Sequence, residues 1–378
     1  MSSSGNSRNG AHSSNGAHSS NRTQTGGSGH PQKKPLTKAQ KAAIRKKKRQ
    51  KKIILVVVEI LVLLLLAVVL FAVVKLSKIE KDTSFDESDL EFNEGLSSES
   101  QQIMKGYTTI ALFGLDNRSN GNLSKGNSDV IMIASINNET KKVKLVSVYR
   151  DTMLKQNGEH YDKANAAYSV GGPETAVNML NENLDLNIQD YVSVNFLALA
   201  DVIDMVDGIT VKLTDEEVVH MNNYCVETSK VTGKKYKKIE PAVAGTYKLN
   251  GVQAVSYARI RYTAGGDYKR TERQRLVLKK TADKLKQQDL ATLNKIIDKV
   301  MPEVSTSFTT KEILSLATGA FDYELGETTG FPFDLETPEQ IPGYSGSYVI
   351  PKGLEENVIK LHQFLYPNKD YTPTATVT

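Results

Sequence analysis

The chain has little of the sulfur and imidazole chemistry on which many enzymes depend. Its 378 residues include one cysteine, Cys225, and six histidines. A lone cysteine excludes an intramolecular disulfide framework and fits an exported bacterial domain that uses no disulfides. We expect Cys225 to be structural. His160, His220 and His362 lie outside the charged motifs described below, so the sequence predicts no catalytic histidine.

Acidic side chains are absent from residues 1–52, which contain 13 Lys and Arg residues and the repeated hexapeptide Asn-Gly-Ala-His-Ser-Ser. Such polar, low-complexity sequence cannot bury a core, so we expect a disordered tail. The other residues contain 35 basic and 43 acidic side chains. The basic isoelectric point therefore belongs to the tail, and it does not indicate that the rest of the chain binds nucleic acid.

A long apolar run covers residues 53–74 and is interrupted only by Glu59. At 1.5 Å per residue, a helix of this length spans about 33 Å, enough for a bilayer core. A signal peptide has a shorter apolar region and a small-residue cleavage site. Basic residues precede the run and few follow it, so the positive-inside rule predicts a single-pass protein with a cytoplasmic N-terminus and the remainder outside the cell.

The remainder alternates strand and helix patterns. We expect strands at 108–113, 129–136, 143–148, 191–196, 208–213 and 347–350. Helices are expected from about Gly171 to Asn183, over 196–206 and from Thr271 onward, with two or three more in 286–367. This order favours a layered α-β-α domain around a central mixed sheet. The predicted organisation is a tail at 1–52, a transmembrane helix at 53–75, an acidic extracellular stalk at 76–104, a folded domain at 105–367 with its motif core at 107–285, and a C-terminal tail at 368–378.

An arginine cluster lies between Tyr257 and Arg275. Ala258 to Arg261 alternates small or apolar with charged residues, which predicts a strand with Arg259 and Arg261 on one face. In the following helix, Arg270, Arg273, Gln274 and Val277 share one stripe. Converging guanidiniums suit a phosphate or pyrophosphate, because each is permanently charged and fork-shaped. A solvated basic helix behind an edge strand is the alternative.

Other charged residues follow strand ends, where ligands gather in α/β sheets. They are Asp116, Arg118, Asp129, Arg150 and Asp151. Carboxylates beside guanidiniums are what a divalent cation bridging a pyrophosphate requires. Taken singly, these residues also suit a turn, a strand cap and a surface ion pair. Taken together, they favour a shared site.

Six motifs in order resemble those of the LytR–CpsA–Psr family of Gram-positive envelope proteins. They are Gly114-Leu-Asp-Asn-Arg118, Ser128-Asp-Val-Ile-Met132, Ser147-Val-Tyr-Arg-Asp-Thr152, Lys163-Ala-Asn-Ala-Ala-Tyr168 with Gly171-Gly172, Ala258-Arg-Ile-Arg261 and Gly266-Asp-Tyr-Lys-Arg-Thr-Glu-Arg-Gln274. The resemblance implies a membrane-anchored phosphotransferase. Such an enzyme moves an anionic glycopolymer (wall teichoic acid, capsular polysaccharide or similar) from a polyprenyl-pyrophosphate carrier to a peptidoglycan hydroxyl. An apolar tunnel for the isoprenoid tail is also implied.

The resemblance also assigns roles to residues. Mg²⁺ or Mn²⁺ would be bound by Asp116 and Asp129. The catalytic set would be Arg150, Arg259, Arg261, Arg270 and Asp267, and the substrate-binding set Arg118, Lys163, Arg273 and Gln274. The general base stays open between Asp129 and Asp267, and a carboxylate that binds metal is a weaker base.

Two other functions fit the same residues. A polyprenyl-pyrophosphate hydrolase would use water as the acceptor, and sequence does not distinguish it from a transferase. A non-catalytic receptor would bind an anionic wall polymer or prenyl lipid through the arginines. Asp116 and Asp129 argue against a receptor, because negative charge weakens anion binding. Transcriptional regulation is rejected as the primary function, since the predicted cytoplasmic part has no helix-turn-helix motif.

Overall fold

The computed structural model describes residues 80–81, 85–115, 123, 126–156, 158, 160–319, 322–367 and 370–377. The chain divides into two units, and all of these residues belong to the second, Leu66–Thr378. The predicted tail and membrane span at 1–75 lie outside the described residues. Within the described part, no helix is both long and apolar enough to cross a bilayer.

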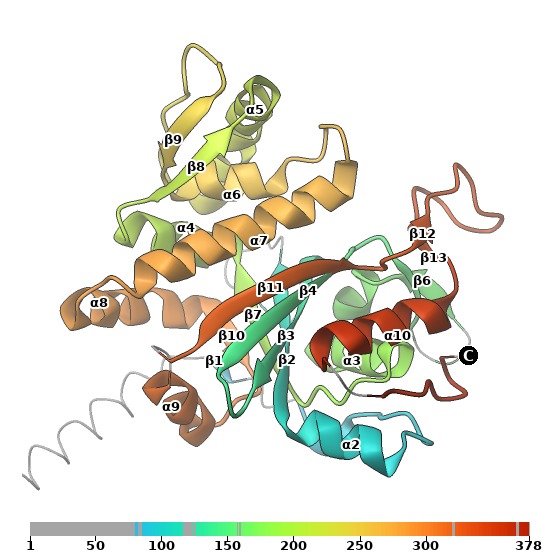
Figure 1. Ribbon diagram of the computed structural model, residues 1–378. Coiled ribbons are helices and arrows are strands. Elements are labelled where there is room, and N and C mark those ends of the chain that lie inside the picture. Colours follow the sequence, from blue (N-terminus) through green and yellow to red (C-terminus); the bar gives the residue numbers. More distant parts are fainter. Residues whose placement is uncertain are drawn as a thin grey trace, which may run out of the picture. The chain divides into compact units, whose positions relative to one another are not determined.

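A mixed seven-stranded sheet forms the centre of the described part (Figure 1). Its strands, in spatial order, are β1 (Glu80–Lys81), β10 (Val304–Thr306), β7 (Asp190–Asn195), β2 (Tyr107–Leu115), β3 (Ser128–Asn137), β4 (Lys142–Val148) and β11 (Glu324–Phe331). Strands β2, β3 and β4 are antiparallel neighbours, whereas β7 runs parallel to β2 and β11 runs parallel to β4. The expected α/β class with a mixed central sheet is confirmed.

The two faces of the sheet differ in how they are covered. On one face, alternate residues of β2 (Ala111, Phe113 and Leu115) are buried in the main core. That core also includes side chains of α2 (Ser98–Lys105), α3 (Ala166–Leu184) and α10 (Leu354–Leu365). The opposite face is covered by α4 (Phe196–Met205), α7 (Gly266–Leu285), α8 (Leu290–Val300) and α9 (Thr310–Thr318).

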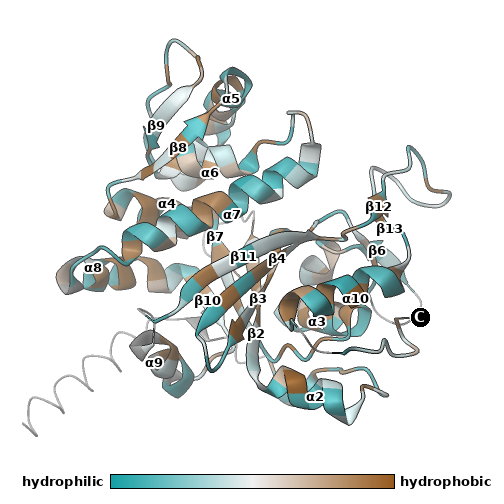
Figure 2. Ribbon diagram, viewed as in Figure 1, coloured by the Kyte–Doolittle hydropathy of each residue, from teal (hydrophilic) through white to brown (hydrophobic). Residues whose placement is uncertain are grey.

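A second lobe packs against helices α4 and α7, which cover this opposite face. A ribbon of β8 (Ile209–Leu213) and β9 (Gly245–Leu249) lies with α5 (Asp215–Thr232) and α6 (Gly251–Arg259) around a separate apolar cluster. Helix α5 begins with a capping box between Thr214 and Glu217. Figure 2 shows hydrophilic residues along much of α7, interrupted by a hydrophobic stretch. Most of the buried residues of α7 are polar, and Val277 is the apolar one among them.

Smaller elements complete the fold. They are the ribbon of β5 (Met153–Lys155) and β6 (Tyr161–Lys163), the ribbon of β12 (Leu335–Glu336) and β13 (Ile350–Pro351), and the 3₁₀ turns Glu87–Asp89 and Met301–Glu303. The strand expected at 208–213 exists as β8, but it pairs with β9 and not with the central sheet.

The strand predicted at Ala258–Arg261 is wrong. Arg259 is the last residue of α6, and Ile260 and Arg261 follow it without regular structure. A capping box between Asn250 and Gln253 starts this helix, and its residues from Gly251 to Ala258 are all buried. Four alternating residues are too few to identify a strand when an adjacent helix with a strong start signal runs into them.

Two predicted boundaries also need correction. The described part of the expected stalk, from Phe85, contributes Leu90, Leu96 and Met104 to the main core. At the other end, Val377 is in the same core, and Thr374 donates hydrogen bonds to the buried carboxylate of Asp185 from its backbone N–H (2.8 Å) and hydroxyl (2.7 Å). These flanking segments therefore belong to the folded domain, because apolar burial and a buried acceptor hold them in place.

Candidate active site

A pocket of about 780 Å³ lies between the sheet and the second lobe. Its walls come from strands β2, β3 and β7 on one side and from helices α4, α5, α6 and α7 on the other. It therefore lies over the ends of several strands, where α/β folds commonly bind ligands. Its lining is charged in one part and apolar in another.

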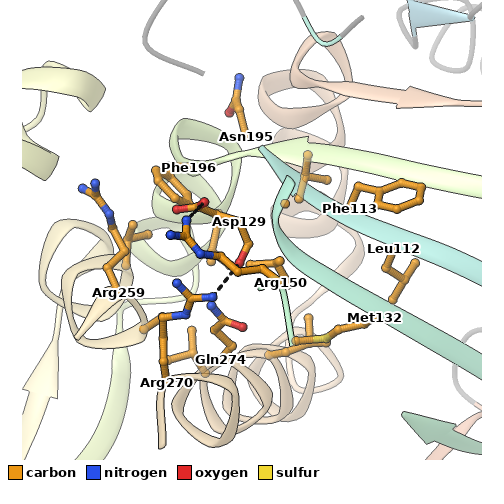
Figure 3. Close-up of a pocket in the computed structure, with 18 of the residues that line it drawn as sticks. Leu112, Phe113, Asp129, Met132, Arg150, Asn195, Phe196, Arg259, Arg270 and Gln274 are labelled. Atoms are coloured by element: carbon orange, nitrogen blue, oxygen red, sulfur yellow. Dashed lines mark hydrogen bonds and ion pairs between the residues drawn. The ribbon is translucent and has the colours of Figure 1, made fainter. Parts of the chain in front are cut away.

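The charged part contains most of the residues that the motifs indicated. Lining residues of this kind are Asp129, Arg150, Arg259, Arg261, Arg270 and Gln274. They come from β3, the end of β4, α6 with its following loop, and α7. Figure 3 shows the side chains of Arg150 and Arg270 close to Asp129, with Arg259 on a neighbouring element. The structure thus brings together guanidiniums that are more than a hundred residues apart in sequence.

The apolar part continues from the charged part into the space under the helices. Its lining includes Leu112, Val130, Met132, Val192, Val194, Leu199, Val255, Val277 and Leu278. Val192 and Val194 alternate with fully buried residues along β7, yet both are only half-buried. Their side chains face the cavity, which explains why apolar residues in the middle of a sheet keep exposed surface.

Arg150 joins two carboxylates at the charged part. Its Nη1 forms an ion pair with Asp129, and its Nε lies 3.4 Å from an Asp151 carboxylate oxygen. Burial lowers the pKa of Arg150, but the nearby carboxylates of Asp129, Asp151 and Asp267 outweigh burial and raise the pKa above its usual value. The guanidinium is consequently held charged and oriented.

Arg270 is more deeply placed, with its side chain only 3% exposed. Its Nη2 lies 2.9 Å from an Asp267 carboxylate oxygen and donates to the Asp129 backbone carbonyl at 3.3 Å. Burial lowers the pKa of Arg270 and raises that of Asp267. In the described structure, Arg270 Nε and the second Asp267 oxygen are buried without a hydrogen-bond partner. Asp267, the ion-pair partner of Arg270, does not line the pocket.

Arg259 is held by the second lobe. Its Nη2 lies 3.1 Å from Glu227 Oε2, and its Nη1 donates to the Thr228 hydroxyl at 3.1 Å. The guanidinium carbon lies 4.9 Å from the centre of the Phe196 ring. Although its predicted strand is wrong, Arg259 still lines the pocket together with Arg261, because the end of α6 points both into the charged part.

Two predicted substrate-binding residues lie outside the pocket. Arg273 is on α7, but its guanidinium donates to Glu217, the Ile260 carbonyl and the Thr263 hydroxyl. It therefore ties the second lobe to the loop after α6. Lys163 lies 3.3 Å from Asp151 and over the Tyr348 ring at 4.8 Å. Gln274, in contrast, lines the pocket as the helical stripe predicts.

The predicted metal site is only partly described, because Asp116 and Arg118 lie outside the described residues. Leu115, which precedes Asp116, pairs with Ser128, the neighbour of Asp129. Among described residues, no group of three His, Cys, Asp or Glu side chains is placed to hold a metal ion. Oxygen ligands from two aspartates nonetheless fit Mg²⁺, which usually takes one or two carboxylates and completes its shell with water and phosphate oxygens.

Sequence patterns did not indicate several lining residues. Tyr224 and Glu227 on α5, and Asn195 at the end of β7, belong to no motif. Asn195 caps α4 through the Ala198 N–H at 2.8 Å, a signal that predicts the helix start only. As expected, Cys225 is fully buried in the second lobe, where burial raises the pKa of its thiol to about 11. A thiol of this kind is a poor nucleophile at neutral pH.

Comparisons with known proteins agree with the motifs. A model of the LytR_cpsA_psr family matches residues 69–325. Biofilm regulatory protein A of Streptococcus mutans is 34% identical over 210 residues, which cover 53% of this chain and 49% of that protein. This chain therefore spans about half the length of that relative.

A second relative matches over more of the chain. It is named polyisoprenyl-teichoic acid–peptidoglycan teichoic acid transferase TagV, from Bacillus subtilis, and is 28% identical over 321 residues, covering 79% of this chain and 74% of the relative. Among solved structures, protein gbs0355 from Streptococcus agalactiae is similar with a TM-score of 0.57 and 29% identity, covering 74% of this chain and 94% of the other.

Proposed function

The chain belongs to the LytR–CpsA–Psr family, and from this premise we propose that it is a glycopolymer phosphotransferase. It would move an anionic glycopolymer, such as wall teichoic acid or capsular polysaccharide, from a polyprenyl-pyrophosphate carrier to a hydroxyl of peptidoglycan. The name of the Bacillus subtilis relative supports this substrate pair. The observation that carries the proposal is the pocket, whose arginine-rich part continues into an apolar cavity.

Each part of the pocket matches one part of such a substrate. Arg150, Arg259 and Arg270 would bind the pyrophosphate oxygens, since guanidinium forks match phosphate geometry and stay charged when buried. The half-buried valines and leucines of β7, α4 and α7 would cover the isoprenoid tail. Moving this apolar tail out of water lowers the free energy of the complex. A receptor for a soluble anion has no use for the apolar cavity.

The reaction would proceed by displacement at phosphorus. The acceptor hydroxyl oxygen bonds to the phosphorus nearest the sugar, and the bond from that phosphorus to the bridging oxygen breaks. Polyprenyl phosphate leaves with the bridging oxygen and its electron pair. Arg150 and Arg270, fixed by Asp129 and Asp267, would stabilise charge on the phosphoryl oxygens. Such positioning and charge stabilisation provide most of the catalysis in phosphoryl transfer.

A divalent cation, Mg²⁺ or Mn²⁺, is part of the proposal. Asp116 and Asp129 would hold it, and when bound it would neutralise phosphate charge and orient the leaving group. We also propose that residues 53–74 cross the cell membrane with the N-terminus in the cytoplasm, which places the pocket outside the cell. A carrier lipid in the outer leaflet would then be on the same side of the membrane as the pocket.

The test uses the full chain in detergent micelles, a polyprenyl-pyrophosphoryl oligosaccharide and a short peptidoglycan acceptor, with and without Mg²⁺. Linked glycan and polyprenyl phosphate are followed by mass spectrometry. We expect metal-dependent transfer that falls about 10²–10³-fold in Arg259→Ala, the usual cost of removing one oxyanion donor. Asp129→Ala should lose the metal dependence together with the activity.

The other functions predict different products. Polyprenyl phosphate released without linked glycan would identify a hydrolase. Lipid that binds but remains intact with every acceptor would identify a receptor. Truncation of residues 1–30 should leave transfer intact, because that part of the tail has no place in the proposed chemistry.

A further inference from the structure

One carboxylate in the pocket has no part in the proposed function so far. Glu227 on α5 lines the pocket, and its side chain is 42% exposed. Among the described lining residues, the other carboxylate is Asp129. Asp129 forms an ion pair with Arg150 and is the proposed metal ligand. Glu227 is therefore a second carboxylate in the pocket, and the proposed function assigns it no role.

The position of Glu227 is fixed by its contacts. Its Oε2 lies 3.1 Å from Arg259 Nη2, while the adjacent Thr228 accepts from Nη1. The Thr228 side chain is fully buried, and the Phe196 ring lies against the same guanidinium. Because a guanidinium carries five N–H donors, Arg259 can donate to a phosphate while it stays paired with Glu227. Glu227 would then lie beside the pyrophosphate.

The other candidate bases are less suitable. A general base must be within hydrogen-bond reach of the proton that it accepts. One oxygen of Asp267 is paired with Arg270, and the other is buried without a partner in the described structure. Asp267 does not line the pocket either. The Tyr224 side chain lines the pocket, but burial raises the pKa of its hydroxyl, which keeps it protonated at neutral pH.

We propose that Glu227 is the general base that accepts the proton of the acceptor hydroxyl, an inference that rests on the proposed transferase function. As the hydroxyl oxygen bonds to phosphorus, its proton passes to a carboxylate oxygen of Glu227. The electron pair of the broken O–H bond forms the new O–P bond. The bond to the bridging oxygen breaks, and polyprenyl phosphate leaves unprotonated at that oxygen.

Several charged or titratable groups line the pocket together with Glu227. Arg259 approaches from α6, Arg270 from α7 and Tyr262 from the loop between them, and Tyr224 is on α5 itself. The other three groups and Glu227 all act electrostatically on Tyr224, so they lie in one neighbourhood. No histidine lines this pocket among the described residues.

The experiment compares wild type with Glu227→Gln, Glu227→Asp and Glu217→Gln in the full chain. Glu217 is a matched control on the same helix, because it also pairs with an arginine (Arg273, 2.9 Å) but does not line the pocket. Binding of farnesyl pyrophosphate is measured by calorimetry, and the kcat of transfer is measured between pH 5 and pH 9. Circular dichroism checks that each variant is folded.

For Glu227→Gln we expect lipid affinity within about threefold of wild type and kcat lower by about 100-fold, a typical general-base contribution. The fall of wild-type kcat at acid pH should disappear in this variant, and Glu227→Asp should recover part of the rate. Glu217→Gln should keep kcat and its pH profile.

Two results would overturn the inference while leaving the proposed function standing. One is a wild-type kcat and pH profile in Glu227→Gln. The other is a loss confined to lipid affinity, which would make Glu227 a positioning residue for Arg259. If the wild type binds lipid but transfers nothing to any acceptor, the proposed function fails first, and the base assignment fails with it.

Discussion

Arg270 and Asp267 show how a buried ion pair at a site can also determine stability. The Arg270 side chain is 3% exposed and that of Asp267 is 17% exposed. Arg270→Met would leave the Asp267 carboxylate buried without its cation, so we expect a loss of about 3–5 kcal/mol in the free energy of unfolding. The double variant Asp267→Asn/Arg270→Met should recover most of that loss, because no buried charge remains. Urea unfolding at pH 7 measures both.

A surface pair on the same helix provides the control. Lys279 and Asp283 are each half exposed and lie 4.0 Å apart, so Lys279→Met should change stability by no more than about 0.5 kcal/mol. Equal stability of the single and double variants at the buried pair would show that the unpaired carboxylate is not the cause.

His362 is a buried imidazole that does not line the pocket. Because of its burial, we expect the free energy of unfolding to fall in acid. Burial lowers its pKa to about 4, although the Leu184 carbonyl and Asp185 oppose this shift. Its Nε2 donates to the Leu184 carbonyl at 2.9 Å, and its ring stacks on Tyr371 with centroids 3.6 Å apart. In the unfolded chain, His362 has a pKa of about 6.5 and binds a proton below that pH. In the folded chain it stays neutral until the pH approaches its lowered pKa. The contribution of the neutral ring is therefore complete above pH 6.5 and is lost as pH falls towards 4.

His362→Phe keeps a ring for the stack and removes the titration. Between pH 7 and pH 4.5 we expect the unfolding free energy of wild type to fall by about 2–3 kcal/mol more than that of the variant, at 1.4 kcal/mol per pH unit. Urea titrations at several pH values compare the slopes, so any constant difference between the two proteins does not matter. Parallel curves would mean that His362 becomes protonated in the folded state without cost.

The positions of single residues at the pocket could be predicted only in part. The helical stripe on α7 correctly placed Arg270 and Gln274 at the pocket. It did not separate them from Arg273, whose guanidinium turns to Glu217. Periodicity identifies a face of a helix, but this face meets both the pocket and the second lobe. Glu227 was not predicted, since a single glutamate on an amphipathic helix has no distinctive pattern.

At the scale of elements, helices α4 and α6 both line the pocket and make an unusually close contact with each other. A Cβ at Gly251 would lie 2.1 Å from the Ala200 carbonyl oxygen, and the obstacle is backbone that cannot rotate away. Gly251→Ala should therefore push the helices apart and cost about 1–3 kcal/mol or more. Leu199 of α4 and Val255 of α6 line the pocket, so lipid binding should weaken as well.

Gly326→Ala on β11 is the control for this prediction, because its Cβ would approach the Val143 carbonyl oxygen no closer than 3.4 Å. Thermal unfolding and binding of farnesyl pyrophosphate should show a clear loss for Gly251→Ala and little change for Gly326→Ala. Similar losses in both variants would contradict the close contact of the two helices.

Strands with strong apolar patterns were predictable, and polar edge strands were not. Residues 108–113, 129–136 and 143–148 lie in β2, β3 and β4, where inward-facing side chains are apolar. Strand β11 is polar along most of its length and was not predicted. It exists because it pairs with β4 at the edge of the sheet, a tertiary interaction that no local pattern encodes. The end of helix α6 was wrongly predicted to be a strand. The buried residues of this helix come before Arg259, so the few residues around the arginines did not reveal the helical pattern.

At the scale of the whole molecule, composition misjudged where the folded domain begins and ends. Acidic and serine-rich sequence between 85 and 104 suggested a stalk, but Leu90, Leu96 and Met104 supply apolar surface to the main core. The C-terminal segment is held by Asp185, which is fully buried and accepts from both Thr374 donors and from Asn93. A few anchoring residues decide such boundaries, and average composition does not detect them.

The pocket lies between the sheet and the second lobe, and its charged part is continuous with its apolar part. We therefore expect both parts to bind the same ligand. We expect affinity to rise from pyrophosphate through geranyl to farnesyl pyrophosphate, by up to about 0.8 kcal/mol for each CH₂ group that becomes buried. Val194→Thr should reduce this increase without changing the affinity for pyrophosphate itself. The hydroxyl keeps the shape of the side chain but puts an unpaired polar group into the apolar wall.

Val226→Thr is the matched control, because Val226 lies on the outer side of α5 with 45% of its surface exposed. Calorimetric titration of the three ligands against wild type and both variants separates the anionic part of binding from the apolar part. If affinity did not depend on tail length, the cavity would not be the lipid site, and the arginines alone would explain binding. If tail dependence were present and equally reduced by both threonine variants, the tail would bind along the outside of α5. A reduction confined to Val194→Thr would place the isoprenoid against β7, next to the arginines that we propose bind its pyrophosphate.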